Sequence, residues 1–207
     1  KHNELLGFEY HTRGVPFLID AGSHVYTSDF DSRNRFRSTA IHNTVMINGE
    51  EQNETRPEWI FRLFESANPE HVLFEENDGR VSYVGRHTGY QRFDVKATHE
   101  RRFDYLRATG ALTITDTLTG DGEADLLWHF HGAPGVAMAA APGLLRLTHQ
   151  GVAVTISLPA GMQAVVSDTL ASPSYGVAVP CQAADIRVRR LLDGRPLVFT
   201  ITPEGTA

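Results

Sequence analysis

The chain has 207 residues, of which 41% are hydrophobic and 21% are charged. This is an ordinary globular composition, and the length suffices for one substantial core. The formal net charge of -6 and the pI near 5.9 argue against a nucleic-acid or anionic-membrane partner, because binding of phosphates needs a basic surface. Cys181 is the one cysteine, which excludes an internal disulfide and a cysteine-based zinc site. A single domain over 1–207 is expected, and the motif-like start without methionine indicates a piece of a longer protein.

Short β signals follow one another along almost the whole chain. Each is rich in branched or aromatic residues and is bounded by Gly, Pro, Asn or Asp. In chain order the expected strands are 5–10, 15–20, 43–48, 59–64, 80–87, 111–118, 124–131, 151–158, 175–180, 185–192 and 196–202. Residues 138–143 (MAAAPG) are expected to form a turn, and no segment reaches the length of a helix. The sequence therefore predicts an all-β protein, built as a large antiparallel β-sandwich.

The segment 111–118 (ALTITDTL) has the alternation of a strand with two different faces. Leu112, Ile114 and Asp116 alternate with threonines. A period of two places the two sets of side chains on opposite sides of a sheet. We expect one face of this strand to be packed and the other to be solvated.

Two groups among the ten histidines have the character of metal ligands. His2, Asp20 and His42 each lie at the edge of an early β segment, and two imidazoles with one carboxylate leave one position open on a tetrahedral zinc ion. The alternative is that these histidines are ordinary surface or hydrogen-bonded core residues. His129 and His131 stand two apart, so a strand places both rings on one face, where they can chelate. No carboxylate partner is evident for this second pair, and two rings at a sheet surface are the simpler interpretation.

Two runs near the start of the chain carry a family resemblance. They are HNELLGFEYHTRGVPFLIDAGSHVYTSD and RNRFRSTAIHNTVMINGEEQNE. They resemble the C-terminal β-domain of the heparinase II/III-like polysaccharide lyases in its patterns His-x-Asp-x-x-x-Phe, Leu-Val-Asp-x-Gly-Thr-Tyr and Phe-Arg-Ser-Thr-x-x-His-Asn-Thr-Val. Weaker similarity continues through THERRF, LLWHFH and SPSYGVAVP. Glu4 stands where the family usually has Asp, and Ser23-His24 replaces Thr-Tyr, with Tyr26 close behind.

The resemblance implies that His2, Asp20 and His42 match the zinc ligands of the family. Zinc is then expected to brace the edge of the sheet, because lyases of this kind act by β-elimination and need no metal-activated water. Glu4 and Asn43 are candidates for orienting the imidazoles. The alternative for Asn43 is a plain turn residue.

Elimination from a uronic acid requires a partner for its carboxylate, together with a base and an acid. Arg33, Arg35 and Arg37 form a local positive group, and a guanidinium can hold a carboxylate through two parallel bonds. Arg35, Arg37 and Tyr26 are therefore expected to bind substrate, with Arg37 facing the cleft. The alternatives are a solvated loop, pairing with the acids of residues 50–54, an Arg37 tied to backbone carbonyls, and a buried structural Tyr26. The resemblance implies that a Tyr and a His of an N-terminal α/α-toroid supply the base, so the catalytic residues lie outside this chain.

The expected function is that of a β-domain in a lyase for acidic polysaccharides such as glycosaminoglycans or alginate. The expected partners are this polysaccharide and the toroid of the same protein, with structural zinc as the cofactor and no nucleic acid or membrane. The resemblance also implies a periplasmic or secreted bacterial protein, and this fragment is expected to be inactive alone. One alternative is a cupin-like non-haem iron oxygenase, because His2-Asn3-Glu4 with a distant histidine imitates a two-histidine, one-carboxylate site. Another is a carbohydrate-binding β-module without catalysis.

Overall fold

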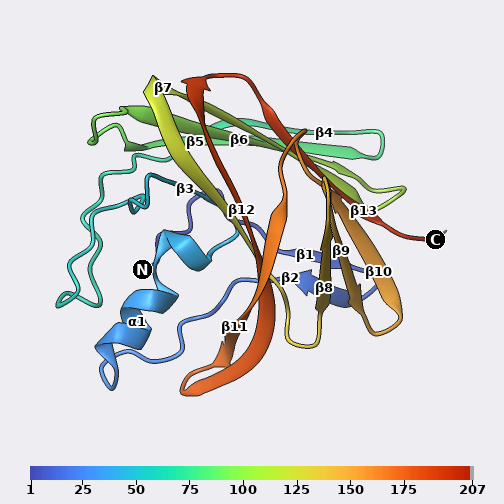
Figure 1. The fold of residues 1–207 in the computed structure, drawn as a ribbon, viewed down its shortest axis with the longest axis horizontal. Helices are drawn as coiled ribbons and strands as arrows, with labels where there is room; N and C mark the ends of the chain where they lie inside the picture. Colours follow the sequence, from blue (N-terminus) through green and yellow to red (C-terminus); the bar gives the residue numbers. More distant parts are fainter. Residues whose placement is uncertain (206–207) are drawn as a thin grey trace.

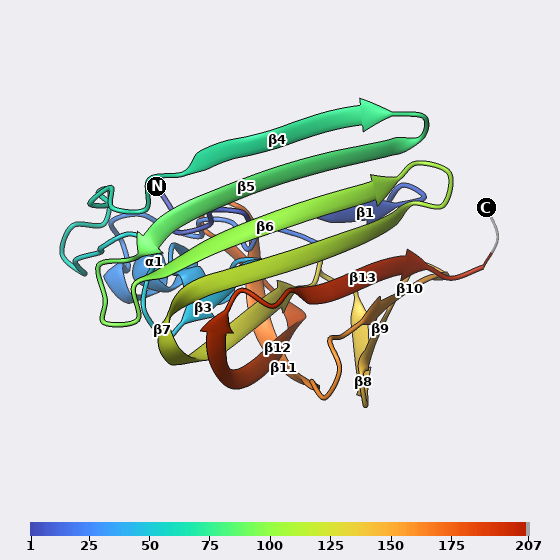
Figure 2. The ribbon, with the colours of Figure 1, turned by 90° about the horizontal axis from the view of Figure 1, so that it is seen from above.

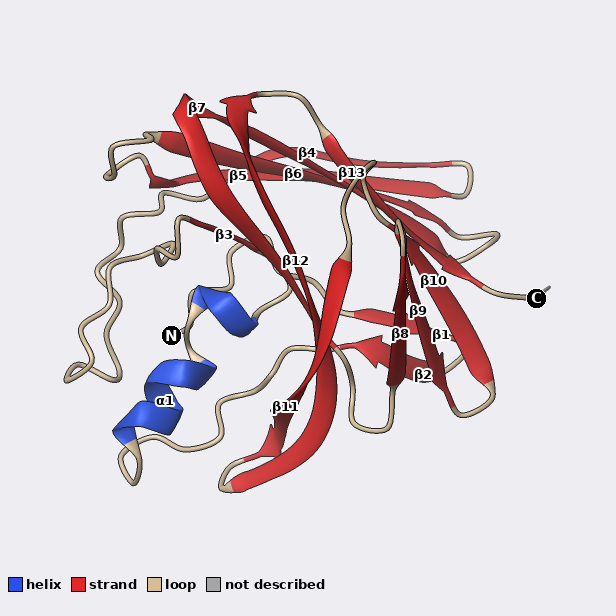
Figure 3. Ribbon diagram, viewed as in Figure 1, coloured by secondary structure: helices blue, strands red, loops and turns tan. Residues whose placement is uncertain are grey.

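The computed structural model describes residues 1–205 and consists mainly of antiparallel strands (Figures 1 and 3). Two short helical elements, α1 (Phe30–Phe36) and the 3-10 helix η1 (Thr39–Ile41), lie together near the N-terminus. The strands are β1 (Tyr10–Thr12), β2 (Val15–Leu18), β3 (Val45–Ile47), β4 (Glu70–Asn77), β5 (Arg80–Tyr90), β6 (Ala97–Leu106), β7 (Ala111–His131), β8 (Ala137–Ala141), β9 (Leu144–His149), β10 (Val152–Ser157), β11 (Ala164–Ser174), β12 (Val177–Asp193) and β13 (Leu197–Pro203). Neither described helix is long and apolar enough to cross a membrane.

The long strand β7 organises the main sheet. Its first half pairs with β6 and β13, and its second half pairs with β12 and β3. The main path of the sheet runs β4-β5-β6-β7-β13-β10-β9-β8, with β11 joined through β12. Figure 2 shows β4 to β7 as one layer, with β8 to β12 arranged beneath it. The sheet is therefore folded into the sandwich that the sequence predicts.

The core lies between these layers and is rich in aromatic side chains. Trp128 and Phe130 of β7 both contact Phe199 of β13, with ring centroids 5.5 Å apart in each pair. The alternation in residues 111–118 holds, because Ile114 and Asp116 are both fully buried. Asp116 is thus a charged side chain on the core face, where it needs polar partners.

Several local expectations are wrong in detail. Residues 30–36 form a helix, which Asp29 caps by accepting a hydrogen bond from Ser32 N. Residues 137–141 form the strand β8 instead of a turn, because they pair with β9. Residues 59–64 form turns instead of a strand, and only the end of 5–10 is extended in β1. The edge strand β4 was missed because its residues are nearly all exposed and lack an apolar alternation.

Candidate functional site

Three separate segments bring the candidate metal ligands together. His2 and Glu4 belong to the first residues of the chain, Asp20 follows β2, and His42 ends η1 just before β3. Gly22 makes the turn after Asp20, since its φ of 82° lets its N–H donate back to Asp20 Oδ1 at 2.8 Å. A side chain at Gly22 would collide with the carbonyl of Ser172, so the backbone there lies against β11.

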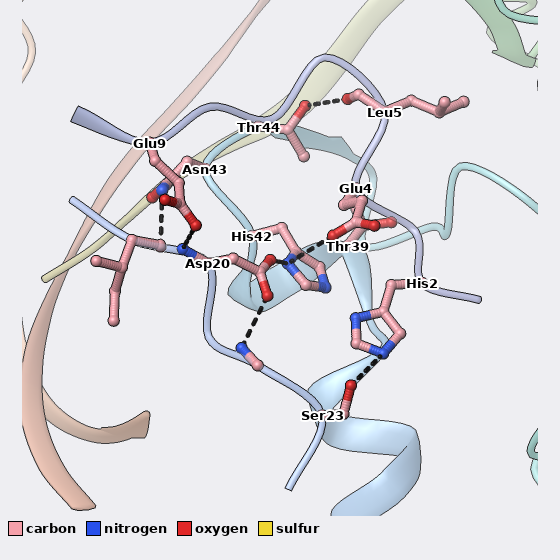
Figure 4. A network of polar contacts seen from close by, with 12 residues as sticks. His2, Glu4, Leu5, Glu9, Asp20, Ser23, Thr39, His42, Asn43 and Thr44 are labelled. Carbon is pink, nitrogen blue, oxygen red and sulfur yellow. Dashed lines mark hydrogen bonds and ion pairs between the residues drawn. The ribbon is translucent and has the colours of Figure 1, made fainter. Parts of the chain in front are cut away.

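The side chains of these segments meet in one cluster (Figure 4). His42 Nδ1 lies 2.7 Å from Asp20 Oδ2 and 3.8 Å from Glu4 Oε2. The rings of His2 and His42 have centroids 5.4 Å apart. On its other side, His2 Nε2 lies 3.3 Å from Ser23 Oγ and 2.8 Å from Arg33 Nη1. The structure thus brings together the predicted trio and adds Glu4 to it.

Burial and hydrogen bonding set the charges of the cluster. Burial first, and then the charges of His42 and Arg33, lower the pKa of His2 to about 4, so its ring is neutral near pH 7. Burial disfavours ionisation of Asp20, but its hydrogen bond and ion pairing with His42 outweigh this and lower its pKa to about 2. Burial raises the pKa of Glu4. A neutral His2 and an ionised Asp20 are in the states that metal coordination requires.

The donor set fits a small divalent cation. His2, Glu4, Asp20 and His42 each bring one donor atom to within 4.8 Å of the others. His42 Nε2 is buried and has no hydrogen-bond partner among residues 1–205, which leaves an imidazole nitrogen free for an ion. Imidazole nitrogens and carboxylate oxygens of this kind are ligands of zinc. A hollow of about 320 Å³ lies beside Glu4, Asp20 and His42.

Asn43 supports the backbone around the cluster. Its amide donates to the carbonyls of Phe8 and Ile19 at 2.7 and 2.9 Å, and its Oδ1 accepts from His131 N at 2.7 Å. Within the part of the chain that the structure describes, no hydrogen bond joins the Asn43 side chain to either imidazole of the cluster. Asn43 is therefore neither the imidazole partner nor the simple turn residue considered from the sequence.

Arg37 is a structural residue in this fold. It is 1% exposed, and its guanidinium donates at 2.9 to 3.0 Å to Asn34 Oδ1 and to the carbonyls of Arg56, Trp59 and Arg62. The expectation that Arg37 faces a substrate cleft is contradicted by this burial. The alternative, an Arg37 tied to backbone carbonyls, agrees with the contacts.

Arg33 and Arg35 point in different directions. Arg33 is also 1% exposed and donates to Ile60 O at 3.2 Å, so it lies behind the cluster instead of in a solvated loop. Arg35 is exposed and donates to Thr169 Oγ1 at 3.0 Å. Among residues 1–205 no carboxylate lies within 4.0 Å of Arg35, so its charge is available to a ligand.

Tyr26 lies in a group of exposed aromatic rings. It is 41% exposed, and its ring lies 5.7 Å from that of Phe61 and 5.4 Å from that of Tyr175. The Arg33 guanidinium lies 5.2 Å from the centroid of the Tyr26 ring, within the range of a cation–π contact. The alternative of a buried Tyr26 is therefore wrong.

The pair His129 and His131 has partners that the sequence did not reveal. His129 Nδ1 lies 2.8 Å from Asp185 Oδ1, and His129 Nε2 lies 3.2 Å from His131 Nδ1. His131 Nε2 in turn lies 3.4 Å from Cys181 Sγ. The pair thus has the carboxylate partner that appeared to be absent, but both nitrogens of each ring are already in polar contacts. Burial raises the pKa of the Cys181 thiol to about 11, so this thiol is protonated near pH 7.

Sequence reasoning missed residues whose importance depends on distant partners. The sequence presents Glu51 only as one of several acids that could pair with the arginines, and Phe61 only as part of an expected strand. Arg101 donates to the carbonyls of Leu6 and Asn43 at 2.8 Å and so connects β6 to two of the three segments that carry the candidate ligands. For the buried ion pair, the sequence offered one signal. Asp116 is an acid on the otherwise apolar face of a threonine-rich expected strand.

The chain is similar in fold to heparinases of known structure. It superimposes on heparan sulfate lyase HepC from Pedobacter heparinus with a TM-score of 0.78 and 15% sequence identity, covering 100% of this chain and 31% of that one. For a heparinase III gene product the TM-score is 0.78 and the identity 18%, with 99% and 31% covered. A crystal structure of heparinase III gives a TM-score of 0.78 and 17% identity, with 100% and 30% covered. The chain therefore spans less than a third of the length of these proteins.

Sequence comparison gives the family directly. A comparison with curated protein sequences found no match. The family model described as Heparinase II/III-like, C-terminal, matches residues 1–197. The matched range includes the whole candidate metal cluster, and the chain belongs to the heparinase II/III-like C-terminal domain family.

Proposed function

We propose that this chain is the β-domain of a polysaccharide lyase that cleaves uronic-acid-containing polysaccharides by β-elimination. The proposal includes a structural zinc ion bound by His2, Asp20 and His42. The observation that carries it is the convergence of these three residues from separate segments, together with a His42 Nε2 that has no hydrogen-bond partner in residues 1–205. Membership of the family adds the lyase chemistry to this geometry.

A structural role for zinc agrees with the number of donors. Glu4 lies within the same donor cluster, so we assign it a place as fourth ligand in preference to an orienting role. Sites with four protein ligands are closed and structural, whereas catalytic zinc sites keep a position for water or substrate. Zinc would here cross-link the first residues, the loop after β2 and the end of η1.

The domain would contribute one wall of the substrate cleft. Arg35 supplies an exposed guanidinium, bound to Thr169 Oγ1 but to no carboxylate of residues 1–205, for the uronate carboxylate. That carboxylate must be neutralised when the neighbouring proton is removed. The exposed rings of Tyr26, Phe61 and Tyr175 supply apolar faces for the sugar. A Tyr and a His of an N-terminal α/α-toroid would act as base and acid.

The substrate class follows from this chemistry and from the similar proteins. The structures with the same fold are named as heparan sulfate lyase and heparinase, which favours a glycosaminoglycan over alginate. Such polymers occur outside the bacterial cytoplasm, so the proposal includes a periplasmic or secreted location.

In the full-length protein, Arg35→Ala should lower activity by about 10- to 100-fold, because a hydrogen-bonded charge pair is typically worth about 1.5 to 3 kcal/mol.

Elemental analysis of the tag-free chain tests the metal site. We expect close to one zinc per molecule, and His42→Ala should remove most of it because it deletes the buried donor. His71→Ala is the matched control, since His71 is exposed and stacks on Tyr83 away from the cluster. A zinc content that is equal in the unaltered chain and in His42→Ala would refute the site.

The alternatives differ in metal and in catalysis. A cupin-like oxygenase would hold iron and turn over 2-oxoglutarate, but the chain has the fold and the family of heparinase β-domains. A carbohydrate-binding module without catalysis would bind acidic polysaccharide, yet the full-length protein would form no unsaturated product. Assay of the full-length protein therefore separates this alternative from the lyase.

A further inference from the structure

Glu51 joins two of the three segments that form the candidate metal site. Its Oε2 accepts hydrogen bonds from Asn3 Nδ2 at 2.9 Å, from Thr39 N at 2.8 Å and from Thr39 Oγ1 at 2.7 Å. Its Oε1 accepts from Ser38 Oγ at 2.5 Å. One carboxylate thus joins the first segment of the chain to the start of η1.

Two of these partners, Asn3 and Thr39, are directly connected to candidate metal ligands. Asn3 is fully buried and stands between His2 and Glu4, so fixing its side chain fixes the backbone of both ligands. Thr39 accepts a hydrogen bond through its carbonyl from His42 N at 3.3 Å. Glu51 therefore acts on both imidazoles of the cluster without being one of its donors.

Glu51 is itself anchored from the far side. Its backbone carbonyl accepts a hydrogen bond from the Arg92 guanidinium, and Arg92 also donates to the neighbouring Gln52 carbonyl at 2.8 Å. Gln52 N donates to Thr39 Oγ1 at 3.2 Å, and its side chain donates to Leu5 O at 3.0 Å. The position of the carboxylate is thus determined by the β5–β6 connection as well as by the ligand segments.

We propose that Glu51 is a positioning residue that sets the spacing between the His2–Glu4 segment and His42, and thereby the affinity of the site for a divalent metal. The inference rests on the proposed zinc site and adds to it the residue that pre-organises the ligands. Residues that orient metal ligands from outside typically change metal affinity by about 10- to 100-fold when they are removed. Glu50 and Glu54, in the same acidic run, are both exposed and make none of these contacts.

The test measures zinc affinity of the 207-residue chain by competition with a chelating dye. Glu51→Ala removes all four hydrogen bonds and should weaken zinc binding by about 10- to 100-fold. Glu51→Gln should stay within about threefold of the unaltered chain, because an amide oxygen can serve Asn3 and Thr39 while the Ser38 hydroxyl accepts from the amide nitrogen. Glu50→Ala changes the same charge at an exposed neighbour and should leave the affinity unchanged.

Two further measurements separate positioning from general destabilisation. The visible spectrum of the cobalt-loaded chain reports ligand geometry, and it should change in Glu51→Ala but not in Glu50→Ala. If Glu51→Ala does not fold, Thr39→Val keeps the side-chain shape but removes the hydrogen bonds of the Thr39 hydroxyl with Glu51 and Gln52 N. It should weaken zinc binding by about 2- to 10-fold.

The outcomes are distinct for the two proposals. No zinc binding by the unaltered chain would overturn both the site and the role of Glu51. Normal zinc binding by the unaltered chain, with the same affinity and cobalt spectrum in Glu51→Ala, would overturn the role of Glu51 alone. If only Thr39→Val folds, unchanged zinc affinity in that variant would likewise overturn the role of Glu51 alone.

Discussion

Arg33, Arg35 and Arg37 show how local periodicity decides the role of a side chain. In an extended loop, three arginines at a spacing of two would lie on one side and form a single positive group. They lie instead on and just after the helix α1, where residues four apart share a face. Arg33 and Arg37 therefore point inward together, and Arg35 points to solvent.

The burial of Arg37 predicts an effect on stability instead of on substrate binding. Arg37→Ala should lower the free energy of unfolding by at least about 2 kcal/mol, because three backbone carbonyls lose a charged donor. Arg35→Ala is the control and should change it by less than about 0.5 kcal/mol, since Arg35 is exposed. Urea unfolding of both variants measures the difference. An Arg37→Ala variant as stable as the unaltered chain would show that the guanidinium is not held as described.

The buried imidazole of His131 should make the stability of the fold depend on pH. Burial first, and then the charge of His129, lower its pKa from an ordinary 6.5 to about 3. Below pH 6.5 the unfolded chain takes up a proton that the folded chain refuses until about pH 3, so this residue makes stability fall as the pH falls through that interval. The slope from one such group is at most about 1.4 kcal/mol per pH unit. Unfolding between pH 7 and pH 4 should show a shallower decline for His131→Asn, and identical slopes would contradict the burial of a neutral ring.

At the scale of elements, strands were predictable where two faces differ. The alternation of residues 111–118 indicates a strand that buries Ile114 and Asp116, and β7 has this arrangement. Residues 59–64 have a β propensity similar to that of residues 111–118, but they form turns. Arg37 binds the carbonyls of Trp59 and Arg62, so a long-range contact overrides the local signal. The exposed β4 is the opposite case, because pairing with β5 makes a strand from residues without a pattern.

The candidate site was predictable to a similar extent. The resemblance implied His2, Asp20 and His42, and the structure brings these residues into one cluster. The roles of Glu51, Phe61 and other supporting residues depend on contacts between segments that are far apart in the chain. Such contacts have no local signature, so they become visible only when the segments are placed in space.

The pairing of β6 with β7 contains the main buried ion pair, and this predicts a large effect for one substitution. Asp116 accepts from Arg101 Nε at 2.7 Å and Nη2 at 2.8 Å, from His99 Nε2 at 2.7 Å and from Trp128 Nε1 at 2.7 Å. Asp116→Asn leaves the Arg101 charge buried without its partner and should destabilise the fold by about 3 to 5 kcal/mol. Asp125 lies on the same strand β7 as Asp116, and Asp125→Asn breaks its exposed pair with Arg189 of β12. This substitution should change stability by less than about 1 kcal/mol. Chemical denaturation measures both variants. An equal loss in the free energy of unfolding for the two would contradict the role of Asp116 as the partner of the buried Arg101.

At the scale of the whole molecule, the chain corresponds to 31% of the length of HepC and places its candidate site near its own N-terminus. Figure 1 shows the N-terminus beside α1 and β3, on the side of the sandwich that carries the long loop before β4. Under the proposed function, the α/α-toroid joins the chain at this side, next to the zinc site and to Arg35. The two domains would then form the walls of one cleft, with the positive charge and the aromatic rings on the β side.

This arrangement predicts that the 207-residue chain has no lyase activity of its own. β-Elimination needs a base held against the proton next to the uronate carboxylate, and correct positioning of reacting groups accounts for a large part of enzymatic rates. In the proposal that base belongs to the toroid, so the isolated chain should form no unsaturated uronate from heparan sulfate or alginate, as followed by ultraviolet absorbance. The full-length protein is the positive control, and zinc-loaded chain should be used so that loss of metal does not explain inactivity. Formation of the unsaturated product by the isolated chain at a rate comparable to the full-length protein would show that the base and acid lie within residues 1–207.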